Sequence, residues 1–239
     1  NNDVLENCAL LGNSSPTDWS AGGGAYRGTL NYCTLSGNSA NYYGGGAAYA
    51  ALNFCVVSNN GLTAYGGGAA DCEVNRCIIV SNSAGWGGGA KSCTLNNSLL
   101  LGNTVNGAGG GAAWSTLNSC TVVYNYAPLS GPGYYAYSGG GIFAASANNC
   151  IVYYNGVVNS AADYGGWTMN HCCTTPDPGG VRNITFAPLF VNPAARDFHL
   201  QNNSPCINAG DNVSVSGAND LDNAVRIKGA TVDIGAYEF

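Results

Sequence analysis

Short runs of alternating apolar and polar residues recur along most of the chain. In the stretch "GGGAAYAALNFCVVSNN" (residues 44–60), three glycines and several alanines precede a segment in which Leu52, Cys55 and Val57 are the inward-facing candidates. Aligned on the cysteine position, the runs place Cys8, Cys33, Cys55, Cys77, Ser98, Cys120, Cys150 and Cys172 in one column, with spacings of 25, 22, 22, 21, 22, 30 and 22 residues. A fixed period in the twenties indicates a solenoid whose coils bury their apolar sides against one another.

The local pattern within each repeat is that of strands. No segment has the 3.6-residue periodicity or the capping residues of a helix, and the multi-leucine consensus of leucine-rich repeats is absent. Short segments rich in β-branched residues are instead broken by glycine and asparagine. We therefore predict an all-β fold, a parallel β-helix over residues 1–175 with about 22 residues per coil and roughly eight coils.

Asparagine recurs at two positions of the repeat. One file lies five residues after the cysteine position and includes Asn38, Asn60, Asn82, Asn103 and Asn125; a second lies two residues before it. Asparagine tolerates the left-handed backbone of a corner, and stacked amides can hydrogen-bond along the axis. We predict a structural asparagine ladder and assign these residues no chemistry.

The pattern changes after Thr175. Residues 187–210, "APLFVNPAARDFHLQNNSPCINAG", and 220–239, "DLDNAVRIKGATVDIGAYEF", resemble a recurring C-terminal module of bacterial secreted right-handed β-helix proteins of the pectate-lyase-like superfold. That module usually reads Asp-Pro-Leu-Phe, Asp-Phe-His-Leu, Ser-Pro-x-Ile-Asp-x-Gly and ends near Asp-Ile-Gly-Ala-Tyr-Glu. The Gly-Gly-Gly-Ala repeats also resemble those of autotransporter-like and polymorphic surface proteins.

The resemblance implies a right-handed helix, secretion and a bacterial cell-surface setting, with residues 176–239 packing on or capping the coils. It implies no activity, because such modules accompany enzymes and adhesins alike. The chain departs from the module at Ala187, Asn208 and Asn223, where the family has Asp, Asp and commonly Gly. These departures leave the packing role intact and weaken any acidic, cation-binding role.

The low content of charged residues limits the classes of binding partner that the chain could have. Only 8% of residues are charged, against about 25% in ordinary proteins, and the net charge is −6. This argues against nucleic acid and anionic membrane surfaces, and no apolar run approaches the length of a membrane span. The chain begins at Asn1 without a signal peptide or a cap for the first coil. We therefore expect a processed or excised segment, whose first coil is capped by a preceding domain or by head-to-tail stacking with a second copy.

Eleven cysteines in a secreted chain would ordinarily suggest disulfides. Most lie in the inward column, however, where we expect reduced, packed thiols. Cys72 and Cys93 form a separate pair one coil apart, for which a disulfide and two free thiols both remain open. No Cys-x-x-Cys motif and only two histidines are present, so the sequence predicts no metal site of this kind.

Candidate catalytic groups are sparse. The repeats contain one charge cluster, Asp71, Glu73, Arg76 and Lys91, which we interpret as a surface ion pair. A lyase would need a base and cations, and a glycosidase would need paired carboxylates in a groove. Calcium could bind Asp220, Asp222 and Asp233, although the spacing lacks the ligand density of known loops. We therefore expect no catalytic residues and no cofactor.

Two regions are candidate contact sites. Outward positions beside the cysteine column form an apolar stripe that either mediates self-association or lies beneath the C-terminal segment; it includes Ile78, Val80, Leu99, Leu101, Val123 and Tyr153. The sixth coil carries an insertion, "APLSGPGYYAY" (127–137), whose Tyr134, Tyr135 and Tyr137 make it either a contact loop or a tolerated insertion.

These features favour a non-catalytic extracellular structural or adhesive protein that associates with itself into a fibre or surface assembly. Cell-surface glycans are a second candidate partner. The alternative hypothesis is a carbohydrate-binding or polysaccharide-degrading β-helix protein of the lyase type.

Overall fold

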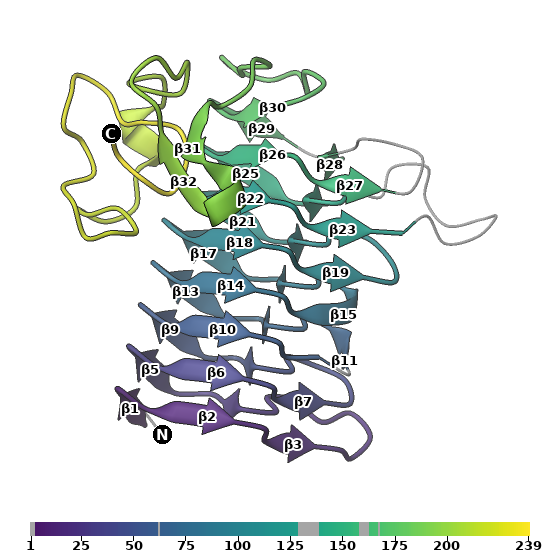
Figure 1. The fold of residues 1–239 in the computed structure, drawn as a ribbon. Coiled ribbons are helices and arrows are strands. Elements are labelled where there is room, and N and C mark those ends of the chain that lie inside the picture. Colours follow the sequence, from purple (N-terminus) through teal and green to yellow (C-terminus); the bar gives the residue numbers. More distant parts are fainter. Residues whose placement is uncertain (1–2, 62, 129–138, 158–162, 167) are drawn as a thin grey trace.

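The chain forms a right-handed parallel β-helix that rises coil by coil from the N-terminus (Figure 1). The computed structural model describes residues 3–61, 63–128, 139–157, 163–166 and 168–239. Within these residues the helical content is limited to two short 3-10 turns, η1 (Pro193–Ala195) and η2 (Asn212–Ser214). The predicted all-β solenoid with about 22 residues per coil is confirmed, with about seven complete turns.

Four parallel sheets run along the axis, one for each side of the coil. The first is β1 (Val4–Glu6), β5 (Thr29–Asn31), β9 (Ala51–Asn53), β13 (Glu73–Asn75), β17 (Thr94–Asn96), β21 (Thr116–Asn118), β25 (Ser146–Asn148) and β29 (Met169–Asn170). The second is β2 (Ala9–Leu11), β6 (Thr34–Ser36), β10 (Val56–Ser58), β14 (Ile78–Val80), β18 (Leu99–Leu101), β22 (Thr121–Val123), β26 (Ile151–Tyr153) and β30 (Cys173–Thr174).

The other two sides are shorter. One begins with the pair β3 (Ser14–Ser15) and β7 (Ser39–Ala40) and continues as β11 (Thr63–Tyr65), β15 (Ser83–Trp86), β19 (Thr104–Val105), β23 (Tyr126–Ala127) and β27 (Gly156–Val157). The last side follows the glycine triplets and consists of β4 (Ala25–Tyr26), β8 (Ala47–Ala48), β12 (Ala69–Ala70), β16 (Ala90–Lys91), β20 (Ala112–Ala113), β24 (Ile142–Phe143) and β28 (Tyr164–Gly165).

Inward columns of Leu, Cys, Val and Ala fill the lumen. Leu52, Val57 and Ile79 have no exposed surface, as expected for side chains stacked on aliphatic neighbours at the same position one coil away. Glycines 45 and 67 allow the flank to close, because a Cβ on either would lie within 3 Å of a backbone carbonyl oxygen of the adjacent coil.

The predicted asparagine ladder is confirmed, and its amides point in one direction. Asn38 donates both its backbone N–H (2.8 Å) and its side-chain amide (3.0 Å) to Oδ1 of Asn60, and the pattern repeats through Asn82, Asn103 and Asn125 to Asn155. The last acceptor is the carboxylate of Asp163, which receives the N–H of Asn155 at 2.7 Å and its amide at 3.1 Å. Burial raises the pKa of Asp163 to about 7, although the hydrogen bonds from Asn155 oppose this shift.

The second asparagine file forms a ladder of opposite direction. The amide of Asn53 donates to Oδ1 of Asn31 at 2.9 Å, and each following residue donates to the preceding coil, through Asn75, Asn96 and Asn118. The expectation that these asparagines take the left-handed backbone is wrong. The positive φ angles lie one residue before the first file, as at Asn59, and one residue after the second, as at Phe54. In the first file, each asparagine donates both its backbone N–H and its side-chain amide to Oδ1 of the asparagine one coil away. The adjacent residue therefore takes the left-handed backbone that turns the corner.

The cysteines are free thiols, and the side chains of the cysteine column accept hydrogen bonds from backbone N–H groups at the corners. The N–H of Cys55 donates to Sγ of Cys77 at 3.2 Å, and the Cys77 N–H donates to the Ser98 hydroxyl at 3.1 Å. Cys72 and Cys93 form no disulfide in this structure. Instead the Cys72 N–H donates to Sγ of Cys93 at 3.4 Å, so this pair repeats the arrangement of the main column.

The C-terminal segment covers part of one face. Its hairpin, β31 (Phe190–Asn192) with β32 (Asp197–Leu200), lies across the upper coils (Figure 1). Phe190, Phe198, Leu200, Cys206 and Ile234 pack on outward side chains of β18, β22 and β26 and form a second core.

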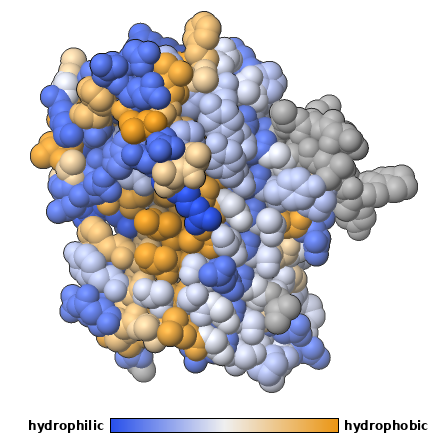
Figure 2. Space-filling view, viewed as in Figure 1, coloured by the Kyte–Doolittle hydropathy of each residue, from blue (hydrophilic) through white to orange (hydrophobic). Residues whose placement is uncertain are grey.

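This packing corrects the prediction of a self-association stripe. Leu99, Leu101 and Val123 are at most 7% exposed, and Ile78, Val80 and Tyr153 are partly buried at the margin of the same core. The stripe is therefore intramolecular over the upper coils. On this face, apolar surface is visible below the C-terminal segment and in patches on the segment itself (Figure 2).

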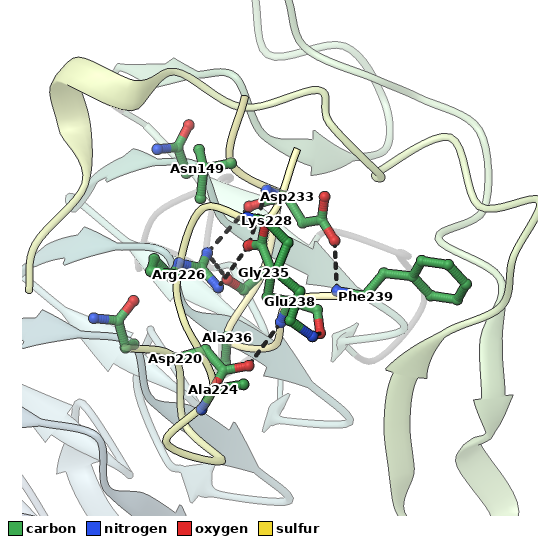
Figure 3. A network of polar contacts seen from close by, with 12 residues as sticks. Asn149, Asp220, Ala224, Arg226, Lys228, Asp233, Gly235, Ala236, Glu238 and Phe239 are labelled. Atoms are coloured by element: carbon green, nitrogen blue, oxygen red, sulfur yellow. Dashed lines mark hydrogen bonds and ion pairs between the residues drawn. The ribbon is translucent and has the colours of Figure 1, made fainter. Parts of the chain in front are cut away.

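A buried polar network closes the C-terminal segment (Figure 3). Arg226 is 1% exposed and donates to the carbonyl oxygens of Asp233 and Gly235 at 3.1 and 2.6 Å, with Glu238 Oε2 at 3.7 Å. Both carboxylate oxygens of Asp220 and of Asp233 accept backbone N–H groups. The carboxylates of Asp220 and Asp233 therefore hold the backbone of the C-terminal segment in place.

Candidate functional site

Aromatic side chains form a row of two ring clusters along the glycine-triplet side of the helix, and Lys91 contacts both clusters. This aromatic belt consists of Trp19, Tyr26, Tyr42, Tyr43, Tyr49, Tyr65, Trp86, Trp114 and Phe143. Its neighbouring rings lie at centroid distances from 4.5 Å (Trp19 with Tyr42) to 6.3 Å (Tyr43 with Tyr49). The belt spans six coils, or about 24 Å at the usual strand spacing.

Two positions of the repeat supply most of the rings. Tyr43, Tyr65 and Trp86 each immediately precede a glycine triplet and stack in register on successive coils. Tyr49 and Trp114 each follow a strand of the alanine-rich sheet, with φ of 56° and 48°. The same left-handed backbone recurs at this corner at Arg27, Asp71, Ser92 and Ala144, so it belongs to the coil and sets the direction in which each side chain projects.

Small residues form the floor between these two rows. Ala48, Ala70 and Ala113 lie outside the lumen core and still have no exposed surface, so neighbouring side chains cover them. The alanines thus allow the rings to lie against the sheet with part of each ring facing solvent: Tyr49 is 46% and Trp114 is 42% exposed.

Lys91 links the two halves of the belt. Its ammonium lies 4.8 Å from the ring centroids of both Tyr43 and Tyr65 and 5.8 Å from that of Trp114. It also donates a hydrogen bond to the Tyr43 hydroxyl at 3.2 Å. The expected ion pair with Asp71 does not form, because the lysine turns toward the π faces instead. The charge cluster predicted from the sequence is also dispersed, since Arg76 stacks on Phe54 and donates to Asn223.

Two hollows adjoin the belt. One of about 470 Å³ lies along β11, β15 and β19, two strands that end in the belt residues Tyr65 and Trp86 and a third beside them, and its polar lining includes Asn41, Ser83 and Asn106. The other, of about 380 Å³, is walled by the rings at the N-terminal end, Trp19, Tyr26, Tyr42, Tyr43 and Tyr49. Aromatic faces therefore lie next to hydroxyl and amide groups on one side of the molecule.

The remaining candidate residues do not join this surface. Tyr134, Tyr135 and Tyr137 lie outside the described residues. Of the three acids considered for calcium, Asp220 and Asp233 are closed by backbone N–H groups and Asp222 binds His199. In the part of the chain that the structure describes, no group of three or more His, Cys, Asp or Glu residues is arranged to hold a metal ion. No helix in that part is long and apolar enough to cross a membrane.

His199 joins the hairpin to the loop that follows. Its Nδ1 lies 2.6 Å from Asp197 Oδ1 and its Nε2 lies 2.6 Å from Asp222 Oδ2. Burial opposes its charge, but the two carboxylates outweigh burial and raise the pKa of His199, while the histidine lowers the pKa of Asp197. The arrangement fits an imidazolium that fastens the C-terminal segment.

Sequence reasoning missed both the belt and Asp163. The signal for the belt was present, because Tyr or Trp precedes three successive glycine triplets and also lies five residues after the start of the triplets 44–46 and 109–111. Asp163 carried no such signal, since it follows Asn155 by eight residues and lies outside the 22-residue register.

No protein-family model and no curated protein sequence matches the chain. Among solved structures, it is similar to pectate lyase Pel9A, with 12% identity and a TM-score of 0.38 over 91% of this chain and 68% of that chain. This likeness carries no argument about activity.

Proposed function

We propose that this chain is a non-catalytic extracellular adhesive β-helix protein that binds polysaccharide through its aromatic belt. The observation that carries the proposal is the row of partly exposed rings, set beside buried alanines and close to a polar hollow. We place the protein at a bacterial cell surface, in keeping with the resemblance of its C-terminal module.

Polysaccharides combine two chemistries that match this surface. The C–H-rich faces of sugar rings are apolar and stack on aromatic rings, whereas their hydroxyl edges seek hydrogen-bond partners. The belt supplies the faces, and Asn41, Ser83 and Asn106 supply donors and acceptors alongside. An extended polymer would contact several coils at once, so many weak contacts would add by multivalency.

Self-association is a separate part of the proposal. Because the stripe is covered over the upper coils, we assign self-association to stacking of the coil ends. Light scattering of the purified chain over a range of concentrations tests this route: growth in mass supports it, and a constant monomer mass removes it.

The competing hypothesis is a polysaccharide lyase. It predicts ultraviolet absorbance from unsaturated chain ends when the protein is incubated with polyuronates. We expect no such absorbance, and its appearance would overturn the non-catalytic assignment.

Binding is tested by affinity electrophoresis through gels containing soluble polysaccharides. Trp114→Ala and Tyr49→Ala should each weaken retardation by roughly 2- to 10-fold, the scale of one aromatic contact of 0.5–1.5 kcal/mol. Tyr32→Ala is the matched control, because Tyr32 has the same left-handed backbone (φ 54°), is 54% exposed and stacks on Phe54 away from the belt. Equal effects of all three substitutions, or none, would refute the assignment.

A further inference from the structure

Between the two exposed rings at one edge of the belt lie two polar side chains at the same position of the repeat. The strands β8, β12, β16 and β20 are in register, and the residues that follow them are Tyr49, Asp71, Ser92 and Trp114. All four have left-handed backbone, with φ from 48° to 56°. Their side chains therefore project in the same direction, and the two rings are three coils, about 14 Å, apart.

The Asp71 carboxylate has a free hydrogen-bonding capacity at this edge. It is partly exposed, and among the described residues the structure gives its oxygens no hydrogen-bond or ion-pair partner. Its charge is felt by the adjacent ring, since burial first and the Asp71 carboxylate second raise the pKa of Tyr49. A carboxylate is an acceptor for two neighbouring hydroxyl donors, and such bonds are stronger than those between neutral groups.

Two cations lie near this edge, and neither pairs with Asp71: the exposed Arg27 follows β4 at the same position of the repeat, one coil below Tyr49, and Lys91 lies on β16. The Lys91 ammonium is turned toward Tyr43, Tyr65 and Trp114 rather than toward Asp71. The chain as a whole carries a net charge of −6, so its long-range field repels polyanions.

Taking these observations together, we infer that the belt is selective for neutral polysaccharides and that Asp71 is its specificity-determining residue. The inference rests on the proposed function. Tyr49 and Trp114 stack on sugar rings at the two ends of the edge. Asp71 accepts hydroxyl hydrogen bonds from a sugar between them, with Ser92 beside it, and the same carboxylate repels a polymer that carries uronate groups.

The test compares hydroxyethyl cellulose and laminarin with polygalacturonate in affinity gels at low and high salt. The wild-type chain should be retarded by at least one neutral polymer and not by polygalacturonate. Asp71→Asn should weaken neutral binding roughly tenfold, the scale of a lost charge-assisted hydrogen bond, and should permit weak retardation by polygalacturonate at high salt. Asn keeps the shape of the side chain and tolerates the left-handed backbone, so the fold is preserved.

Glu73→Gln is the matched control, because it removes the same charge from an exposed position on β13 and should leave all retardation unchanged. If Trp114→Ala weakens binding but Asp71→Asn does not, or if polygalacturonate binds the wild type best, the selectivity is wrong and the proposed function stands. If no polymer retards the wild type, both are wrong.

Discussion

Replacing Asp163 by asparagine should stabilise the β-helix at neutral and alkaline pH. The side chain is 3% exposed and accepts two hydrogen bonds from Asn155 at the end of the inward ladder. An asparagine placed there accepts the same two hydrogen bonds with its Oδ1 and extends the ladder by one amide. It does so without burying a charge.

The magnitude follows from the pKa. Burial raises the pKa of Asp163 from 3.8 to about 7, so the folded chain holds this proton more tightly than the unfolded chain. The free energy of unfolding therefore decreases as the pH rises from about 4 to about 7. The loss approaches 4 kcal/mol, from about three pKa units at 1.36 kcal/mol each. Above pH 7 the penalty is complete, and below pH 4 it is absent.

Urea unfolding followed by tryptophan fluorescence at pH 5 and pH 8 measures this effect as a difference between wild type and Asp163→Asn, which cancels the other titrating groups. The variant should gain about two to three times as much stability at pH 8 as at pH 5. Asp163→Ala separates charge from hydrogen bonding, because it leaves the Asn155 donors without an acceptor and should be less stable than Asp163→Asn by about 1–3 kcal/mol. A stability difference between wild type and Asp163→Asn that does not change with pH would refute the reasoning.

Three further predictions concern the C-terminal segment and the thiols. Asp222→Asn should lower the pKa of His199 in an NMR titration. Because the pKa of His199 is raised in the folded chain, its ion pairs with Asp197 and Asp222, here called the histidine clasp, stabilise the fold fully below about pH 6.5. This stabilisation is lost as the pH rises through the folded pKa. An unchanged titration would contradict the histidine clasp. Arg226→Met should cost about 3–5 kcal/mol in urea unfolding, because it leaves Glu238 and its neighbouring buried acids uncompensated, and a cost below about 1 kcal/mol would contradict this account. One thiol of eleven should react promptly with a thiol reagent in the native state, and Cys8→Ser should abolish that reaction; fast labelling of further thiols would show that the columns open readily.

The repeat itself could be predicted because its determinants recur in every coil. Asn60 and Cys55 each donate a hydrogen bond to an equivalent residue one coil away. The same contact pattern is therefore repeated many times within the one sequence. The apolar stripe was ambiguous for a physical reason. An outward Leu99 or Val123 has the same pattern whether its cover is a second chain or the C-terminal segment of its own. Only the three-dimensional path of residues 176–239 decides between the two.

The belt was harder to predict because its rings alternate between two positions of the repeat. Tyr43 precedes its glycine triplet, whereas Trp114 follows its alanine pair, and the two belong to one surface only after the coils stack. The contacts of Lys91 were hard to predict for the same reason. Its sequence position suggested an ion pair with Asp71, but its ammonium lies against the rings of Tyr43, Tyr65 and Trp114 on other coils.

The buried alanines separate the scaffold from the proposed recognition surface. Every column that holds the coils together points inward or along the axis, whereas the belt is held by outward positions beside alanines 48, 70 and 113. Coils could therefore be exchanged or duplicated as whole units with the ladders intact, and only the order of the outward rings would change. Evolution or protein engineering could thus change the outward rings of such a β-helix while the inward columns and ladders that determine its fold stay the same.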